Sequence, residues 1–374
     1  MPIPFGKPHF SPAARRQIAD GLERMLSSGQ LMLGEFTQKL EDGFASYVGT
    51  SSAVSTNSCT TALQICLLHY DVKGREVLVP SAGFITDISV IRWAGGTPVL
   101  VDTNPDTLSF DLVDLARKLT PKTKGIIWVH LTGLISPQWQ EIVAFARAHG
   151  LFLIEDCAHA HGASVDGRKA GSIGDVGCFS FYPTKVMTAG TGGVLVTSDA
   201  DLVRDARELR LFGRRDGVGH VWPEGNDWFL DEIRACVAYY QLCELDDSLR
   251  RRREIARRYD EKLAGVPGFT RLHVPAGHQP SYYHYTVFLD PGVDYAKVST
   301  RLKEKHGIPT KPIYVPLHQE PVFRDLDTGT LTKTEDVLAR SLCLPLFVDL
   351  ADEDVDRVAQ ALAAELRGVE CATA

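Results

Sequence analysis

Short apolar runs alternate with amphipathic stretches along most of this sequence. Runs at residues 77–79, 97–101 and 151–154 have the length and composition of buried strands. Stretches with helical periodicity lie between them, for example at residues 112–119 and 141–149. Because strands that alternate with helices at this spacing form parallel sheets, we predict an α/β fold with a mostly parallel, doubly wound sheet covered on both faces. A ligand site is then expected at the carboxyl ends of the strands.

The pattern changes near residue 245. One long helix is predicted over residues 245–263, and a Val-Pro-Gly sequence ends it. A chain of 374 residues is long enough for two domains. We therefore expect an N-terminal arm and a large domain over residues 1–245, and a smaller α+β domain over residues 246–374.

Two residues of one stretch are candidates for chemistry. The apolar run at 151–154 ends in two carboxylates, Glu155 and Asp156, and Lys185 follows in a loop rich in Gly and Thr. A lysine that forms a Schiff base must be neutral part of the time, and pyridoxal phosphate needs such a lysine together with an acid against its pyridine nitrogen. Asp156 and Lys185 fit these two roles. On spacing alone, a strand-end Asp that caps a turn and a solvated Lys explain the pair more often.

Four blocks around these residues add a more specific signal. They are EDCAHAHGA at 155–163, GSIGD at 171–175, CFSFYPTK at 178–185 and the Gly192-Gly193 pair. In order and spacing they resemble the DegT/DnrJ/EryC1/StrS family of pyridoxal-phosphate sugar aminotransferases, and the resemblance extends over nearly the whole chain. It implies an aspartate-aminotransferase-like fold, which is fold type I of the pyridoxal phosphate enzymes. It also implies that Lys185 binds the cofactor and that Asp156 holds the ring nitrogen.

The resemblance implies a phosphate site as well. Hydroxyl residues at the start of a helix cap its N-terminus, and the same free N–H groups can bind an anion. In the family this turn holds the cofactor phosphate, and Cys59 stands where the family usually has Gly. We expect the thiol to shift the contact to Thr60 and Thr61, and Ser180 matches the family's second phosphate contact.

Two rings match positions that pack against the cofactor in the family. Phe84, which lies in a helix predicted over residues 82–93, matches an aromatic residue on the pyridine ring, although a core Phe explains it equally well. His159 comes three residues after Asp156, at the place of a family Gln or His. No metal site is expected, because the His-Ala-His sequence lacks Cys or carboxylate partners at zinc spacing.

One block departs from the family pattern. Asp227 takes the place of an Asn that reaches the phosphate of the neighbouring subunit's cofactor, and Phe229 takes the place of an Arg. A carboxylate would repel a phosphate, so either Asn226 substitutes or this contact is absent. Gly34 and His318 match positions near the substrate, although an ordinary loop glycine and a solvent-facing histidine explain them as well.

Composition limits the setting in which the protein works. The chain is 44% hydrophobic and 23% charged, which is ordinary for a soluble protein, and its net charge of −7 argues against a nucleic-acid partner. No apolar run approaches the ~20 residues that span a membrane, and the N-terminus lacks a signal-peptide pattern. The eight cysteines include no CxxC pair, as expected of free thiols in a reducing compartment. We expect a cytoplasmic homodimer with active sites at the subunit interface.

The implied activity is transfer of an amino group from an amino acid, with L-glutamate expected, to a keto sugar that is most often nucleotide-linked. A cyclitol or another non-nucleotide keto sugar is an open alternative. Some relatives dehydrate keto sugars, but those carry His in place of the lysine, and Lys185 argues against this reaction. A regulator with a vestigial cofactor fold is disfavoured because Asp156, Lys185, Ser180 and the hydroxyl turn are all present.

Overall fold

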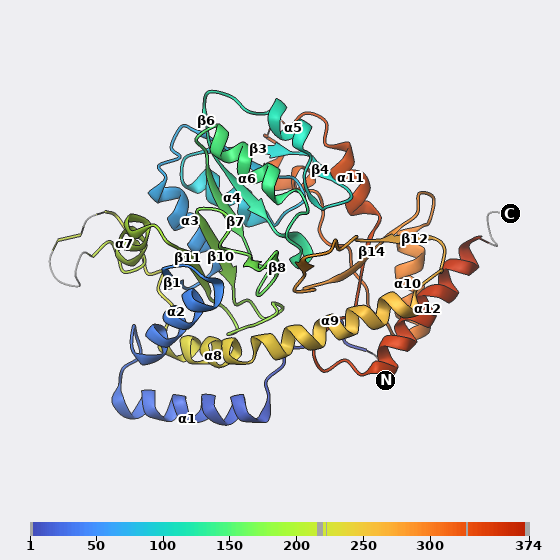
Figure 1. The fold of residues 1–374 in the computed structure, drawn as a ribbon, viewed down its shortest axis with the longest axis horizontal. Helices are drawn as coiled ribbons and strands as arrows, with labels where there is room; N and C mark the ends of the chain where they lie inside the picture. Colours follow the sequence, from blue (N-terminus) through green and yellow to red (C-terminus); the bar gives the residue numbers. More distant parts are fainter. Residues whose placement is uncertain (1–2, 215–219, 222, 327, 371–374) are drawn as a thin grey trace.

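The computed structural model describes residues 3–214, 220–221, 223–326 and 328–370. A seven-stranded sheet in the order β1-β11-β10-β7-β6-β2-β3 forms its centre (Figure 1). Only β11 runs against its neighbours; the pairs from β10 to β3 are all parallel. The mostly parallel doubly wound sheet is therefore confirmed. Its strands are β1 (Ser52–Thr56), β2 (Glu76–Pro80), β3 (Thr97–Val101), β6 (Thr123–Val129), β7 (Phe152–Asp156), β10 (Val176–Ser180) and β11 (Gly193–Thr197).

Helices cover both faces of this sheet because its strands are apolar on both sides. In β2, Leu78 packs into one core, whereas Val77 and Val79 pack into another on the opposite face. The first core takes its helical side chains from α2 (Glu35–Val48), α5 (Leu112–Arg117), α6 (Trp139–Ala148) and α8 (Glu232–Cys243). The second takes them from α3 (Cys59–His69), α4 (Ile85–Trp93) and α7 (Ala200–Leu209).

The N-terminal arm is the helix α1 (Pro12–Ser28), which lies outside these layers and packs along α8 (Figure 1). The side chain of Ser11 caps it by accepting a hydrogen bond from the N–H of Ala14 at 3.0 Å. Gly29 ends it with a φ of 72°, a conformation that glycine adopts without strain.

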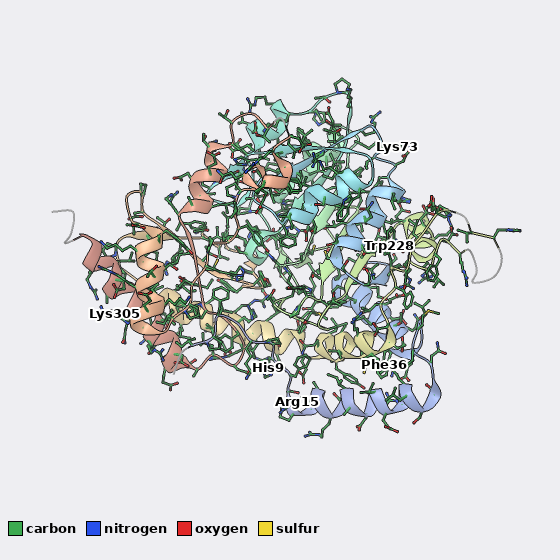
Figure 2. The ribbon with its side chains drawn as sticks, turned by 180° about the vertical axis from the view of Figure 1, so that it is seen from behind. His9, Arg15, Phe36, Lys73, Trp228 and Lys305 are labelled. Atoms are coloured by element: carbon green, nitrogen blue, oxygen red, sulfur yellow. The ribbon has the colours of Figure 1, made fainter. Side chains whose placement is uncertain are left out.

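The C-terminal region builds a third core. It consists of a three-stranded antiparallel sheet, β12-β14-β15, with helices α9, α10 and α12 packed around it. Viewed from behind, Lys305 lies on this side of the molecule, and Lys73 and Trp228 lie on the side of the central sheet (Figure 2). The elements are α9 (Leu245–Lys262), β12 (Phe269–Arg271), β14 (Tyr285–Leu289), α10 (Tyr295–His306), β15 (Ser341–Leu344) and α12 (Asp352–Glu370).

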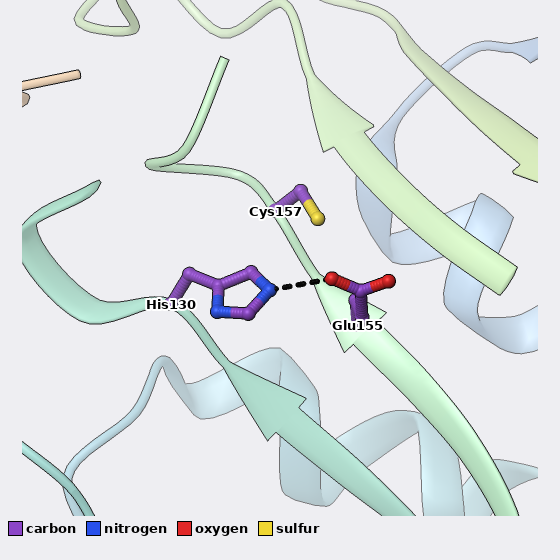
Figure 3. A group of neighbouring side chains, drawn as sticks. All are labelled: His130, Glu155 and Cys157. Carbon is purple, nitrogen blue, oxygen red and sulfur yellow. Dashed lines mark hydrogen bonds and ion pairs between the residues drawn. The ribbon is translucent and has the colours of Figure 1, made fainter. Parts of the chain in front are cut away.

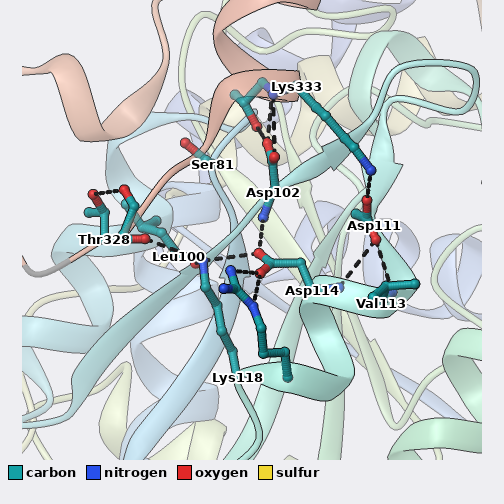
Figure 4. A network of polar contacts seen from close by, with 12 residues as sticks. Ser81, Leu100, Asp102, Asp111, Val113, Asp114, Lys118, Thr328 and Lys333 are labelled. Atoms are coloured by element: carbon teal, nitrogen blue, oxygen red, sulfur yellow. Dashed lines mark hydrogen bonds and ion pairs between the residues drawn. The ribbon is translucent and has the colours of Figure 1, made fainter.

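Part of the C-terminal region returns to the central sheet. Side chains between Ile313 and Leu338 belong to the second core, against β2 and α4. Asp102, just after β3, accepts hydrogen bonds from the N–H and the hydroxyl of Thr334 at 2.8 and 2.7 Å. The Asp114 carboxylate in turn accepts the Asp102 N–H at 2.8 Å (Figure 4). These carboxylates fix the start of helix α11 (Thr332–Ala339) on the large sheet. A boundary at residue 245 stays a prediction.

The remaining elements are short connections. They are β4 (Thr103–Asn104), β5 (Ser109–Phe110), β8 (Ser164–Val165), β9 (Arg168–Lys169), β13 (His278–Gln279) and the 3₁₀ turns Leu131–Gly133, Leu317–Gln319 and Pro321–Phe323. Cys66, Cys178 and Cys343 are buried and free, as the sequence predicts. Among the described residues, no helix combines the length and the apolarity that a membrane span requires.

The sequence places one helix start wrongly. The helix predicted over residues 82–93 begins at Ile85, three residues later. The backbone of Phe84 is extended, because the Asp87 carboxylate accepts its N–H at 2.9 Å and caps the helix there. Phe84 is thereby left outside the helix, beside the carboxyl ends of the strands.

Candidate active site

A cavity of about 470 Å³ lies where the C-terminal region meets the carboxyl ends of β7 and β10. Seven of the predicted residues line it: Cys59, Thr60, Phe84, Asp156, His159, Ser180 and Lys185. They come from four separate segments, so the fold gathers residues that are far apart in the sequence. A larger cavity of about 740 Å³ beside β12 and β14 contains none of the predicted residues.

Asp156 is the last residue of β7 and is 5% exposed. Its Oδ1 accepts a hydrogen bond from the N–H of Ala158 at 2.8 Å, which holds the carboxylate at the strand end. Successive side chains of a strand point to opposite faces, so Glu155 and Asp156 face opposite ways. Only Asp156 lines the cavity.

Glu155 lies in a closed group with His130 and Cys157, all three fully buried (Figure 3). One of its oxygens accepts from Ile173 and Gly174 N–H at 2.7 Å; the other accepts from Gly171 N–H at 2.9 Å and faces the His130 Nε2 at 2.8 Å. The three atoms are close enough to share a metal ion, but both carboxylate oxygens are already saturated. Glu155 therefore anchors the glycine-rich loop rather than offering a ligand site.

Lys185 lies in the turn after β10, where its N–H donates to the Tyr182 carbonyl at 3.0 Å. Its ammonium is 4.6 Å from the centre of the Tyr283 ring. Burial lowers the pKa of Lys185 to about 8, the Asp156 carboxylate opposes this shift, and the Lys311 ammonium adds to it. A lysine with this pKa is neutral for about a tenth of the time at pH 7 and can act as a nucleophile or a base.

The N-terminus of α3 forms the polar end of the cavity. The Ser58 hydroxyl caps it by accepting from the Thr61 N–H at 3.1 Å. Within the described residues, the N–H groups of Cys59 and Thr60 meet no acceptor. A Cβ on Gly193 would lie 2.4 Å from the Cys59 nitrogen, so only glycine lets β11 approach this turn so closely. Free N–H groups at a helix N-terminus form an anion site.

Aromatic rings form another wall. His159 stacks on Tyr283 with ring centres 4.0 Å apart, and its Nε2 is 2.9 Å from the Tyr314 hydroxyl. Burial and then the Lys185 charge hold the pKa of His159 well below its ordinary value, so the ring is neutral. Phe84 is 45% exposed, which is unusual for Phe, and it lines the cavity.

Four further residues were not found from the sequence. Tyr283, Lys311 and Tyr314 line the cavity, and Asp87 is fully buried next to Asp156. The Oδ2 of Asp87 accepts the Phe84 N–H, whereas Oδ1 has no donor among the described residues. Burial and then the Asp156 charge raise the pKa of Asp87 well above its ordinary value. Its position three residues after Phe84 is typical of a helix cap and does not by itself indicate a site.

Four predicted residues lie outside the cavity. The Thr61 hydroxyl donates to Asn57 Oδ1 at 2.6 Å, and Gly34 donates its N–H to Glu232 at 2.8 Å. Asn226 is exposed, and His318 bridges Ser81 and Glu335 at 2.8 and 2.9 Å. Their roles toward cofactor or substrate stay predictions, and for Asn226 the predicted contact is with a second subunit.

The residues that line the cavity fit pyridoxal phosphate. Its volume is within the range of small-molecule sites. Lys185 offers an amine with a lowered pKa, Asp156 a buried carboxylate, and α3 free N–H groups for a phosphate. Phe84 and His159 offer flat surfaces for a ring. The groups that line the cavity therefore match what this cofactor requires.

Comparison with known proteins gives a consistent result. The sequence profile of the DegT/DnrJ/EryC1/StrS aminotransferase family matches residues 12–363. The chain is 35% identical to the GDP-perosamine synthase of Caulobacter vibrioides, over 95% of this chain and 98% of that protein. The structure of DesI in the presence of its TDP-sugar product matches with a TM-score of 0.91 and 32% identity, over 100% and 95% of the two chains. The PLP-form of the putative sugar aminotransferase Spr1654 from Streptococcus pneumoniae matches with a TM-score of 0.90 and 27% identity, over 99% and 100%.

Proposed function

Because the chain belongs to the DegT/DnrJ/EryC1/StrS aminotransferase family, we propose that it moves an amino group from an amino acid to a nucleotide-linked keto sugar. Enzymes of this family depend on pyridoxal phosphate, and the chain has the fold type I architecture. The observation that carries the proposal is the cavity where Lys185, with its lowered pKa, lies beside Asp156 and the α3 N-terminus. The names of the relatives, a GDP-sugar synthase and an enzyme with a TDP-sugar product, support a nucleotide-linked acceptor.

We assign cofactor-binding roles to five of the cavity residues. Lys185 Nζ would be the attachment point, and Asp156 would pair with the ring nitrogen and keep a proton on it. The N–H groups of Cys59 and Thr60, together with Ser180, hold the phosphate. The α3 N-terminus suits this role because helix dipoles favour negative charge at that end.

The chain's own groups then move the protons. Pyridoxal phosphate, when bound, supplies an electron-poor ring that stabilises the negative charge left on a carbon after proton loss. Once the donor's nitrogen has displaced Lys185 Nζ, the freed amine would take the proton from Cα of the amino acid and pass it to the carbon that held Nζ, which completes the first half of the reaction. In the second half it delivers a proton to the former ketone carbon of the sugar. His159 stays neutral throughout. The 2.9 Å contact between its Nε2 and the Tyr314 hydroxyl fixes the orientation of its ring.

We extend the proposal to a cytoplasmic homodimer with L-glutamate as donor. Large apolar side chains are exposed near α1 and the start of α8: Leu22, Leu26, Leu31, Met32 and Ile233. Leu31 and Met32 lie close to Ile233, since the Glu232 N–H donates to the Leu31 carbonyl at 3.0 Å. An exposed apolar patch of this kind supports a subunit interface. Sedimentation of the purified protein tests it, and a monomer at micromolar concentration would contradict it.

An absorbance and acceptor screen tests the activity. The purified protein should show the visible band of pyridoxal phosphate bound to a lysine, and L-glutamate should bleach it. Among candidate acceptors, a nucleotide-linked keto sugar should restore the band and form the amino sugar. Restoration only by a free cyclitol ketone or a non-nucleotide sugar would favour that alternative acceptor. No restoration by any ketone, with loss of water from a keto sugar instead, would overturn the aminotransferase assignment.

A further inference from the structure

Among the described residues, Lys311 is the one lysine besides Lys185 that lines the cavity. Its backbone is fixed, because the Cys343 N–H of β15 donates to the Lys311 carbonyl at 2.8 Å. Its ammonium lies 4.8 Å from the centre of the Phe5 ring. Burial lowers the pKa of Lys311, and the side chain is only partly exposed. The C-terminal region thus holds a cation on a rigid element at the cavity wall.

No carboxylate of the described residues pairs with this ammonium. Its ammonium lies over the aromatic ring of Phe5, and burial is the main cause of its lowered pKa. A partly buried ammonium without an anion is costly, so such a group commonly serves a ligand.

The charges of the cavity favour an anionic ligand. Asp156 is the one carboxylate among the described residues that line the cavity with Lys185 and Lys311, and His159 beside them is a neutral imidazole. The α3 N-terminus already provides a site for the cofactor phosphate, which leaves Lys311 for a second anion. We propose that Lys311 binds the α-carboxylate of the amino-acid donor, an inference that rests on the proposed function.

Bond lengths favour the α-carboxylate over a sugar phosphate. The carboxylate carbon of an amino acid lies only about 2.5 Å from its nitrogen, which must replace the Lys185 nitrogen during the reaction. Lys311 is near enough to Lys185 and His159 for its charge to lower the pKa of both. The phosphate of a nucleotide sugar is separated from the keto carbon by several bonds of the sugar ring. A cation this close to Lys185 therefore suits the donor.

The donor half-reaction tests the inference without any sugar. Holoenzyme is mixed with L-glutamate, with L-glutamine, which lacks the side-chain carboxylate, or with L-isoglutamine, which lacks the α-carboxylate. Conversion of the PLP form to the PMP form is followed by absorbance. Lys311→Met should lower the second-order rate constant for glutamate and for glutamine by about ten- to hundred-fold, the range expected for losing a charged hydrogen bond. For isoglutamine the loss should be less than about two-fold, since the carboxylate is absent from that compound.

Matched variants separate charge from structure. Lys311→Arg keeps the cation and should retain most of the rate, and Lys73→Met, on the side of the central sheet (Figure 2), should leave it unchanged. Equal losses for all three amino acids, or no loss for any, would overturn the inference. A loss confined to glutamate and isoglutamine would assign Lys311 to the side-chain carboxylate and overturn it too.

The acceptor half-reaction provides a second, independent test of the role of Lys311. The KM of the keto sugar should change by less than about two-fold in Lys311→Met. A rise in that KM with an unchanged donor reaction would assign Lys311 to the acceptor's phosphate and overturn the inference. If the donor reaction behaves as expected but no keto sugar accepts the amino group, the proposed acceptor is wrong while the role of Lys311 stands. A wild-type holoenzyme that none of the three amino acids converts would overturn both.

Discussion

Two carboxylates adjacent in the sequence lie in opposite surroundings. Glu155 faces a closed interior, where three backbone N–H groups and His130 surround its oxygens. Asp156 faces the cavity, where the Ala158 N–H is the only backbone donor to it among the described residues. Both are at most 5% exposed. Burial alone therefore does not separate a structural acid from a functional one.

The two carboxylates differ in how many hydrogen bonds each can still accept from a ligand. A carboxylate can accept about four hydrogen bonds, and Glu155 uses all of them within the chain. Asp156 keeps capacity for a ligand and lies near an amine whose pKa is lowered to about 8. The predictions below test whether the two faces of β7 serve structure and chemistry separately.

The largest effect is expected at Lys185. Lys185→Ala removes the amine that we assign to cofactor attachment and proton transfer, so turnover should fall by at least about 10²–10⁴-fold, the usual contribution of a positioned acid or base. The visible band should be lost as well. Steady-state rates and the absorbance spectrum measure both, with Lys73→Ala as a control. Wild-type rates with an intact band would show that the amine lies elsewhere.

A smaller but distinct loss is expected at Asp156. Asp156→Asn keeps the shape of the side chain and removes its charge, so kcat should fall by about 10²–10³-fold, as for removal of one preorganised electrostatic contact. Because the Asp156 charge raises the pKa of Lys185, that pKa should drop below about 8 in the variant. A pH titration of the lysine in cofactor-free protein, by its rate of modification, checks the direction. An upward shift of this pKa would contradict the geometry.

The large-sheet wall of the cavity could be predicted because its residues lie at strand ends and helix starts. Asp156 ends an apolar run, and Cys59 and Thr60 begin a helix, so local pattern and family motif coincide. Lys185 is positioned by a turn next to β10 and by the same motif. Each of these positions depends on nearby sequence.

The opposite wall depends on contacts between distant segments. Lys311 is placed by its pairing with Cys343, and Tyr283 reaches the site through Thr184, at 2.9 Å between hydroxyls. Periodicity and spacing near these residues do not indicate a cavity, although His318, seven residues after Lys311, matches a family position near the substrate. Asp87 resembles an ordinary helix cap, and only the tertiary fold brings it next to Asp156. The start of α4 was mispredicted for a different, local reason, since helical periodicity does not show where the Asp87 cap on Phe84 interrupts it.

On the closed face, Glu155→Gln should affect stability rather than chemistry. It replaces a fully buried charge with an amide whose NH₂ must face N–H donors, so the free energy of unfolding should fall by about 3–5 kcal/mol. The protein that remains folded should keep kcat within a few-fold. Urea unfolding and kinetics at low temperature measure the two effects. Asp156→Asn is the comparison, since it should lower kcat more than stability. A large loss of kcat at unchanged stability would assign Glu155 to the chemistry.

The smallest expected effect is the pH dependence contributed by Asp87. Its pKa is raised in the folded chain by burial and by Asp156, whereas the unfolded value is near 3.8. Between these two values the folded protein holds a proton that the unfolded chain has released, so stability falls as pH rises through this window and levels off above the folded pKa. Asp87→Asn cannot lose that proton. Wild-type stability minus that of Asp87→Asn should therefore decrease with pH from about 4 upward, measured by urea unfolding of cofactor-free protein. Asp20→Asn, on α1, is the control and should leave the difference flat. A difference that increases with pH would mean that Asp87 is ionised and stabilising, and a second charged carboxylate would then lie next to Asp156.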